Sequence, residues 1–352
     1  MAGLKMLLDP TKMGTEGETL EENLRKRIVG QDAAIRQIVD VYQTFLAGMS
    51  NPGRPIANFL FLGPTGSGKT RTVEALAESL VGDPRALIKI DCAEYQHGHE
   101  IAKLIGSPPG YLGHKETHAL LSQEALDQFY TDKVKLSFVL FDEIEKASDS
   151  LWNLLLGILD KATLTLGDNR RVDFSRSMIF LTSNLGAAEM EAILRPRLGF
   201  RVHDPVAPAG QAGRLDSAGT EAARRRFSPE FMNRIDRTVV FNPLGREELQ
   251  RILTLELEAV ERRILLATGA ASIDCSLNDA ARDFLLAEGT DARYGARHLK
   301  RAVERLLVQP IANLIASGQL QSNDRLLVEY DAGIRRLIFA KESTLAVGSA
   351  AA

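Results

Sequence analysis

The stretch NFLFLGPTGSGKT, residues 58–70, decides the fold of this chain. Its first part is a nearly all-apolar run of strand length, and a glycine-rich turn follows before a helical pattern begins near Thr70. Strand, turn and helix in this order form a phosphate-binding loop, because backbone N–H groups of the turn can surround a phosphate. The lysine offers a cation to phosphate oxygens, and the threonine hydroxyl can ligate Mg²⁺. We therefore expect these residues to bind the phosphates of a nucleotide: Gly63, Pro64, Thr65, Gly66, Ser67, Gly68, Lys69 and Thr70.

Other short apolar runs surround this loop along the chain. Together with Asn58–Leu62 they are Leu87–Ile90, Phe138–Phe141, Met178–Thr182 and Thr238–Phe241. Helical or loop segments separate them, a pattern typical of a parallel sheet covered by helices on both faces. From Arg246 onward the pattern turns mainly helical, with strands expected at Ser272–Cys275 and Arg325–Tyr330. The chain is therefore predicted to be α/β, followed by a second, smaller and mainly helical domain.

The boundaries of the domains follow from glycine and proline positions and from apolar periodicity. We expect a flexible segment at 1–23, a large domain at 24–241, a small domain at 242–340 and a flexible tail at 341–352. Helices are predicted from about Leu20 to Arg27 and from Asp32 to about Leu46. The stretch from His203 to Thr220 is rich in Gly, Ala and Pro without an apolar period, so it is predicted to be a surface loop.

A second chemical signal follows the strand predicted at Phe138–Phe141. That strand runs directly into Asp142 and Glu143 at its carboxyl end, the edge where open α/β sheets bind ligands. By itself an apolar strand ending in two acidic residues is more often a solvated loop start. Because a phosphate loop precedes it, Asp142 is expected to bind Mg²⁺ and Glu143 to polarise an attacking water. This pairing predicts hydrolysis of ATP with Mg²⁺ as the metal.

Further motifs resemble the second-ring ATPase module of Clp chaperones, in the AAA+ superfamily. Asn184 follows the strand at Met178–Thr182 and is similar to the sensor-1 residue that orients water, and Arg234, in FSPEFMNRID, is similar to the arginine finger. Arg297, in GARHLKR, resembles the sensor-2 arginine. The resemblance also implies that Ile28, Val29 and Ile252 flank the adenine. It implies an AAA+ P-loop fold and, because the finger acts on a neighbouring subunit, a homo-hexameric ring.

The segment GSPPGYLGH, residues 106–114, is similar to the substrate-gripping loop of that family. The resemblance places Gly110, Tyr111, Leu112 and Gly113 on a mobile loop facing the channel, with Tyr111 in contact with a translocating polypeptide. The residues from Gly167 to Phe174 match a family hairpin near the channel. The alternative for Pro-Pro-Gly-Tyr is an ordinary turn. On the resemblance, the substrate is expected to be protein.

Composition limits the other classes of function. Lys and Arg number 43 against 46 Asp and Glu, a net charge of -3, so no global positive field attracts nucleic acid or an anionic membrane. No apolar run approaches the ~20 residues of a membrane span. Two cysteines cannot make a disulfide framework, and we expect a cytoplasmic protein. The spacing of Cys92, His97 and His99 fits no common zinc pattern, and Arg224–Arg226 is expected on a solvated helix face.

Three classes of function stay open, led by an ATP-driven protein unfoldase or disaggregase. The others are a nucleic-acid motor and a nucleotide-switched scaffold. Within the leading class, Leu198, Gly199 and Phe200 lie where some relatives carry a tripeptide that docks on the ClpP peptidase, so a protease subunit is an alternative. A Leu-Gly-Phe triplet could equally pack at a helix end. The resemblance covers roughly residues 24 to 330, as expected of a minimal single-ring form or of one module of a longer protein.

Overall fold

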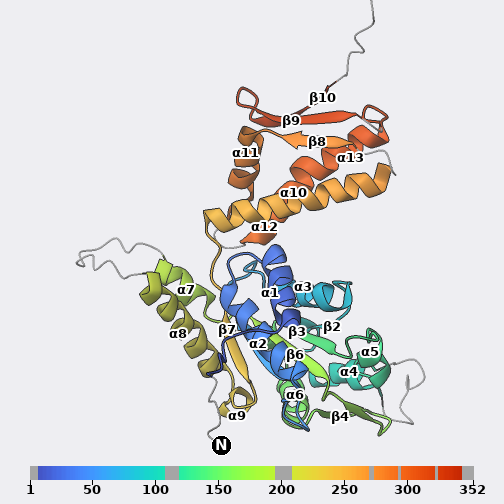
Figure 1. Cartoon of the computed structure of the whole chain (residues 1–352), viewed down its shortest axis with the longest axis vertical. Helices are drawn as coiled ribbons and strands as arrows, with labels where there is room; N and C mark the ends of the chain where they lie inside the picture. Colours follow the sequence, from blue (N-terminus) through green and yellow to red (C-terminus); the bar gives the residue numbers. More distant parts are fainter. Residues whose placement is uncertain are drawn as a thin grey trace, which may run out of the picture. The chain divides into compact units, whose positions relative to one another are not determined.

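The computed structural model describes residues 7–107, 119–194, 208–268, 273–291, 295–321 and 324–342. They form two compact units (Figure 1). The first contains the chain up to Pro64 and then Gly68–Pro243; the second contains Thr65–Ser67 and the chain from Leu244 onward. The sequence had predicted the division at 241.

A five-stranded parallel sheet forms the centre of the first unit. Its strand order is β2-β3-β6-β1-β7, in which β1 spans Ala57–Leu62, β2 Ile88–Asp91, β3 Ser137–Asp142, β6 Ser177–Ser183 and β7 Arg237–Val240. The predicted parallel sheet is thus confirmed. Leu62 at the carboxyl end of β1 lies beside Ser183 on one side and Val240 on the other. This register brings the ends of β1, β3 and β6 to one edge.

Alternate residues of the central strands enter two separate hydrophobic clusters, one on each face. Phe59 and Phe61 pack with the helices that come early in the chain, and the ring of Phe59 stacks on Phe180 at 5.1 Å. Leu60 and Leu62 pack on the opposite face against α6. Complete burial of one such side chain contributes about 1.5–3 kcal/mol. The helices of this unit are α1 (Thr15–Arg27), α2 (Asp32–Leu46), α3 (Lys69–Val81), α4 (Ala102–Ile105), α5 (Gln123–Asp127), α6 (Asp149–Lys161), α7 (Ala187–Leu194), α8 (Pro208–Arg226) and α9 (Pro229–Met232).

Helix α1 corrects the prediction of a flexible segment through residue 23. It begins at Thr15, and its residues Leu20 and Leu24 are buried one turn apart in the same cluster as α2. Gly17 is also buried, where a Cβ would lie 2.3 Å from the Gln43 amide nitrogen. Gly17 thus lies close to the Gln43 side chain of α2, although a glycine suggests a loop when only the sequence is considered.

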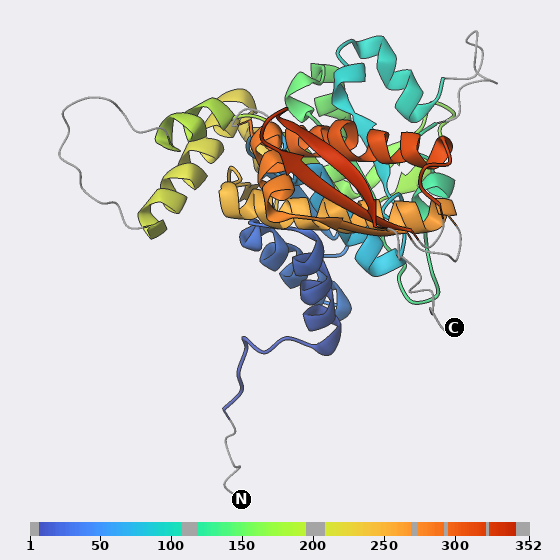
Figure 2. The ribbon, with the colours of Figure 1, turned by 90° about the horizontal axis from the view of Figure 1, so that it is seen from above.

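Helix α8 shows that the loop predicted from His203 to Thr220 is wrong from Pro208 onward. Leu215, Ala222 and Ala223 are buried, and Gly219 lies on the same stripe, at helical spacing. A Cβ on Gly219 would lie 2.7 Å from the Met190 methyl group of α7. Small residues therefore let α8 approach α7, beside which it lies in both views (Figures 1 and 2). Such a stripe carries too few large apolar residues to be recognised as a helical period.

The second unit is a set of helices packed on a three-stranded sheet. Its elements are α10 (Arg246–Thr268), β8 (Asp274–Leu277), α11 (Asp279–Gly289), α12 (Ala296–Val303), a π-helical turn η4 (Glu304–Val308), α13 (Gln309–Ala316), β9 (Arg325–Asp331) and β10 (Arg336–Glu342). β9 pairs in parallel with β8 and antiparallel with β10. β9 and β10 lie over α10 (Figure 2). β10 was not predicted, because only Leu337 and Phe339 of this edge strand pack on the core.

Short elements outside the sheets complete the first unit. The turn Gly167–Phe174 predicted as a hairpin contains β5 (Arg171–Asp173), which pairs with β4 (Thr163–Thr165). Single turns of 3-10 helix lie at Cys92–Glu94 (η1), Gly98–Ile101 (η2) and Ile144–Lys146 (η3). Within the described ranges, every helix falls short of the length and apolar character needed to cross a bilayer.

The two cysteines lie in different units. Cys92, the first residue of η1, is fully buried, and burial raises the pKa of its thiol. The rings of His97 and His99 are exposed and stack on each other at 5.8 Å, whereas Cys92 is buried. These three side chains therefore do not come together as metal ligands. Burial also raises the pKa of Cys275, on β8, to about 11.

Candidate active site

The glycine-rich loop between β1 and α3 is built from backbone conformations that favour glycine. Gly63, Gly66 and Gly68 have positive φ angles of 143°, 77° and 102°. A Cβ on Gly63 would lie 2.5 Å from the Phe241 carbonyl oxygen, so this position has no room for a side chain. The loop ends at Gly68, and Lys69 is the first residue of α3. The N–H groups of this first turn are thereby available to a phosphate.

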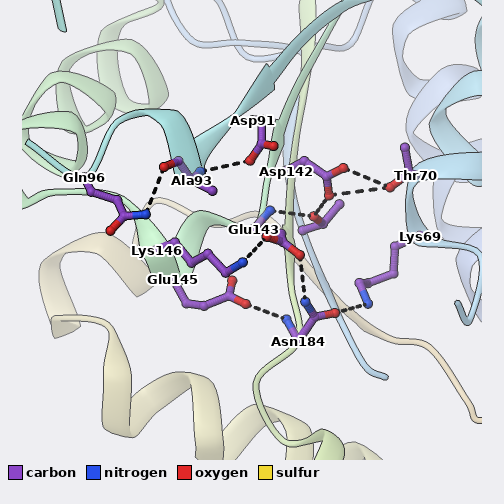
Figure 3. Close-up of polar contacts among 11 residues, drawn as sticks. Lys69, Thr70, Asp91, Ala93, Gln96, Asp142, Glu143, Glu145, Lys146 and Asn184 are labelled. Carbon is purple, nitrogen blue, oxygen red and sulfur yellow. Dashed lines mark hydrogen bonds and ion pairs between the residues drawn. The ribbon is translucent and has the colours of Figure 1, made fainter. Parts of the chain in front are cut away.

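Lys69 is nearly buried, with 7% of its surface exposed. Its ammonium group donates to the carbonyl oxygens of Gly63 at 2.7 Å and Pro64 at 2.9 Å, and to Asn184 Oδ1 at 3.0 Å (Figure 3). An ammonium group held by these oxygens beside the glycine-rich loop can also donate charge-assisted hydrogen bonds to a phosphate. The Lys69 ammonium group thus contacts both the loop that follows β1 and the residue that follows β6.

Asp142 lies at the end of β3 and accepts hydrogen bonds from two hydroxyl groups. Thr70 Oγ1 donates to Asp142 Oδ2 at 3.2 Å, and Thr182 Oγ1 of β6 donates to Oδ1. Lys89 of β2 lies 3.7 Å from the same carboxylate. Carboxylate and hydroxyl oxygens are ligands that Mg²⁺ prefers. The residues present at this point therefore fit a magnesium ion.

Glu143 has a left-handed backbone, with φ 56°, that turns the chain sharply after β3. Its backbone N–H donates to Thr182 Oγ1 at 3.1 Å, and its carboxylate accepts from Asn184 Nδ2 at 3.4 Å (Figure 3). The Lys146 ammonium group, 2.5 Å from Glu143 Oε2, is a further partner of this carboxylate. The hydrogen bond to Glu143 raises the pKa of Lys146. The carboxylate is thus directed towards Asn184, whose amide oxygen meets Lys69.

Glu145 is a site residue that the sequence analysis missed. Its Oε1 accepts the backbone N–H of Asn184 at 3.1 Å, so it fixes the main chain of the residue that bridges Lys69 and Glu143. The signal was available in the sequence, because Glu145 follows Glu143 by two residues. A third carboxylate, three residues after the strand end at Asp142, nevertheless has no role in the phosphate-loop pattern.

Arg224–Arg226 lie on an exposed face of α8, as predicted, and Arg226 makes contacts that were not predicted. It donates to the Glu145 carbonyl oxygen at 3.0 Å, and its guanidinium lies 4.4 Å from the centre of the Trp152 ring. Trp152 Nε1 in turn donates to the Ile144 carbonyl oxygen at 3.1 Å. These contacts fix two consecutive carbonyl groups of the turn that follows Glu143.

Arg234 is not part of this cluster. It follows α9, and its guanidinium contacts two acidic residues, Glu230 at 3.2 Å and Asp160 at 3.9 Å. Its Nη1 also donates to the Glu230 carbonyl oxygen at 2.8 Å, and the side chain is 22% exposed. The first unit therefore carries two separate candidate sites, the Lys69 cluster and the surface around Arg234.

The remaining predicted site residues lie in different parts of the chain. Ile28 and Val29 are buried in the first unit, where nearby Gln31 exchanges hydrogen bonds with the backbone of Asn242 at 2.9 and 3.0 Å. In the second unit, Ile252 is half-buried against the core, and Arg297 lies on α12. Arg297 lines a basic hollow with Lys300, Arg301 and Arg305.

Two predicted segments lie outside the described residues. They are Gly110, Tyr111, Leu112 and Gly113, and the triplet Leu198, Gly199 and Phe200. The chain just before residue 108 is described: Gly167 of the β4–β5 turn donates to the Ile105 carbonyl oxygen at 2.8 Å, and a Cβ on Gly167 would lie 2.4 Å from the Gly106 carbonyl oxygen. The hairpin therefore lies next to the residues that lead into 108–118.

Comparison with known proteins matches both units. A family model for the AAA domain (Cdc48 subfamily) matches residues 54–238, and one for the C-terminal D2-small domain of ClpB matches residues 244–328. Chaperone protein ClpB 1 of Parasynechococcus marenigrum is 39% identical over 318 residues, 90% of this chain and 34% of the relative. ClpB of Bdellovibrio bacteriovorus is 39% identical over 313 residues, 88% of this chain and 33% of the relative. The chain thus spans about a third of the length of these curated relatives.

A solved structure is similar over nearly the whole chain. It is a closed-state cryo-EM reconstruction of Hsp104 with ATPyS and FITC casein, with a TM-score of 0.76 and 29% identity. The match covers 93% of this chain and 52% of that one.

Proposed function

Because this chain belongs to the Clp-type AAA+ ATPases, as a module of the second-ring kind, we propose that it hydrolyses ATP and uses the energy to unfold or disaggregate proteins. The observation that carries the proposal is the meeting of Lys69, Glu143 and Asn184 at the carboxyl ends of three neighbouring strands. A cation for phosphate, a carboxylate for water and an amide between them are the groups that hydrolysis of a phosphoanhydride requires.

Each residue of the cluster has a distinct part in the proposed reaction. Lys69 and the loop N–H groups bind the phosphates, Glu143 accepts a proton from the attacking water, and Asn184 orients that water. Thr70 and Asp142 would hold Mg²⁺, which supplies positive charge to the phosphate oxygens when bound. Glu145 keeps the Asn184 backbone in place through the 3.1 Å hydrogen bond.

The parts of the site beyond the cluster are proposed from the family resemblance. Ile28, Val29 and Ile252 flank the adenine, and Arg297 contacts the nucleotide of its own subunit. Arg234 reaches the nucleotide of a neighbouring subunit, where its planar fork stabilises the charge of the transition state. A residue that acts in this way requires a closed ring of subunits, which we propose to be a homo-hexamer.

Assembly is therefore expected to depend on nucleotide. ATP that contacts Lys69 of one subunit and Arg234 of the partner subunit binds the ring more tightly than the monomer, so by linkage it favours the ring. Sedimentation velocity at micromolar concentration, with and without a slowly hydrolysed ATP analogue, measures this directly. A monomer under both conditions would contradict the ring.

The proposed substrate is an extended polypeptide gripped by Tyr111, whose ring can contact any chain without selecting its sequence. Tyr111→Ala is expected to lower unfolding of a tagged fluorescent reporter by an order of magnitude or more. Basal ATPase activity should stay within about threefold of wild type, because the aromatic ring takes no part in the chemistry proposed for the Lys69 cluster. Both rates are measured on the same preparation.

Tyr111→Phe is the matched control, since it keeps the ring and loses only the hydroxyl group, and most unfolding activity should remain. Unfolding by Tyr111→Ala at the wild-type rate would contradict a role in translocation and would leave the ATPase proposal intact.

With a formal net charge of -3 we propose protein rather than nucleic acid as the partner, and the cytoplasm as the compartment.

A further inference from the structure

Asn58 is a fully buried polar residue on β1, a strand whose other side chains are all apolar. Its Nδ2 donates to two backbone oxygens, that of Leu159 at 3.0 Å and that of Arg234 at 2.9 Å. Both amide hydrogens are thus used. Because a buried amide N–H without an acceptor is costly, these two carbonyl groups determine the orientation of the Asn58 side chain.

The two carbonyl groups that Asn58 contacts belong to the surroundings of the Arg234 side chain. Leu159 lies next to Asp160, and Asp160 is one of the two carboxylates near the Arg234 guanidinium. Arg234 contributes the second carbonyl group itself. The Asn58 amide therefore fixes the distance between the end of α6 and the backbone of Arg234.

The backbone of Asn58 makes a second connection to the same segment. Its N–H donates to Asp236 Oδ2 at 2.8 Å, and the Asp236 N–H donates to the Asn58 carbonyl oxygen at 2.9 Å. Arg54 lies 3.4 Å from the other carboxylate oxygen of Asp236. The segment that carries Arg234 is thus attached to Asn58 of β1 at two points, Arg234 and Asp236.

Asn58 is remote from the phosphate loop along its own strand. Gly63 is five residues further along the chain, and at about 3.3 Å per residue this is about 17 Å of extended chain. A change at Asn58 should therefore reach hydrolysis through Arg234 rather than through the loop.

We propose that Asn58 is a positioning residue for Arg234, which fixes the point from which the guanidinium reaches the nucleotide of the partner subunit. This inference rests on the proposed function, in which Arg234 acts across the interface. It makes Asn58 necessary for hydrolysis at the neighbour's site and dispensable for ATP binding at its own.

The test uses Asn58→Leu, which keeps a similar volume and removes both donors. Turnover of the full chain should fall about 10-fold, and ATP affinity should stay within about twofold. The variant is then mixed in equal amounts with Glu143→Gln, which is inactive at its own site but carries an intact Arg234. Half of the Asn58→Leu subunits, a quarter of all sites, then receive an intact Arg234, so activity should rise to about a quarter of wild type.

A parallel mixture of Arg234→Ala with Glu143→Gln separates this inference from the proposed function. If that mixture does not recover activity, Arg234 does not act between subunits and both proposals fail. If it recovers while the Asn58→Leu mixture stays at the mean of its two components, only the positioning role is wrong. Ser177→Ala, which changes another buried polar side chain, on β6, should leave turnover unchanged.

Asn58→Ser, with a shorter hydroxyl donor, covers the case in which the leucine variant does not fold. It should show a smaller loss of turnover and the same recovery in the mixture. If both variants lose ATP affinity, Asn58 maintains the fold and not the position of Arg234, and the proposal is overturned.

Discussion

Glu143→Gln should lower ATP turnover by at least about 100-fold and leave ATP affinity within about threefold of wild type. Glutamine can still accept the hydrogen bond from Asn184, but it cannot take a proton from water. The exchange also removes the ion pair between Glu143 and Lys146. The Lys146 side chain is 48% exposed and that of Glu143 30%, so the loss of stability should be small. Steady-state phosphate release and binding of a fluorescent ATP analogue measure the two quantities.

Glu94→Gln is the matched control, because it makes the same chemical change on an exposed carboxylate of η1. Its turnover should equal that of wild type. Rapid hydrolysis by Glu143→Gln would mean that another group activates the water, and Glu145 would then be the next residue to replace.

Lys69→Ala should instead abolish binding, with a loss of ATP affinity of at least about 100-fold. The ammonium group is the cation at the centre of the loop, and charge-assisted hydrogen bonds to phosphate are the strongest contacts such a loop makes. Removal of Lys69 also deprives Asn184 of the partner at 3.0 Å, so hydrolysis of any ATP that still binds should be slow. Calorimetric titration with ATP in the presence of Mg²⁺ measures the affinity.

Arg71→Ala serves as the control for a lost positive charge on the same helix. Arg71 is exposed on α3 and pairs with Glu74 and Glu78, so its removal should not change ATP affinity. Unchanged affinity in Lys69→Ala would place the phosphates elsewhere and would contradict the proposed site.

The sequence predicted the parts of the fold that rest on long apolar runs or on fixed spacing. Each apolar run of the first unit is a strand in the structure, because a parallel strand that is buried on both faces needs apolar side chains on both faces. Asp142, Glu143 and Asn184 were also predicted, because they lie at strand ends that strand order brings together, and Lys69 because it ends the glycine-rich loop that follows β1.

What could not be predicted depends on contacts between distant segments. Helix α8 is stabilised by the fit of Gly219 against Met190, and no local pattern indicates a packing partner. Arg226 stacks on Trp152, although it looks like one of three solvated arginines. Asn58 is the polar residue of an otherwise apolar strand, and only the fold brings the carbonyl groups of Leu159 and Arg234 next to it.

The raised pKa of both thiols has a practical consequence for experiments on this protein. Thiol-specific reagents attack the thiolate, and with a pKa of about 11 only about one molecule in a thousand carries that form of Cys275 at pH 8. Cys92 is fully buried and ionises even less readily. A cysteine introduced at an exposed position has an ordinary pKa of about 8.5 and would react far faster. A fluorophore or crosslinker can therefore be attached at a chosen point while the native thiols are kept.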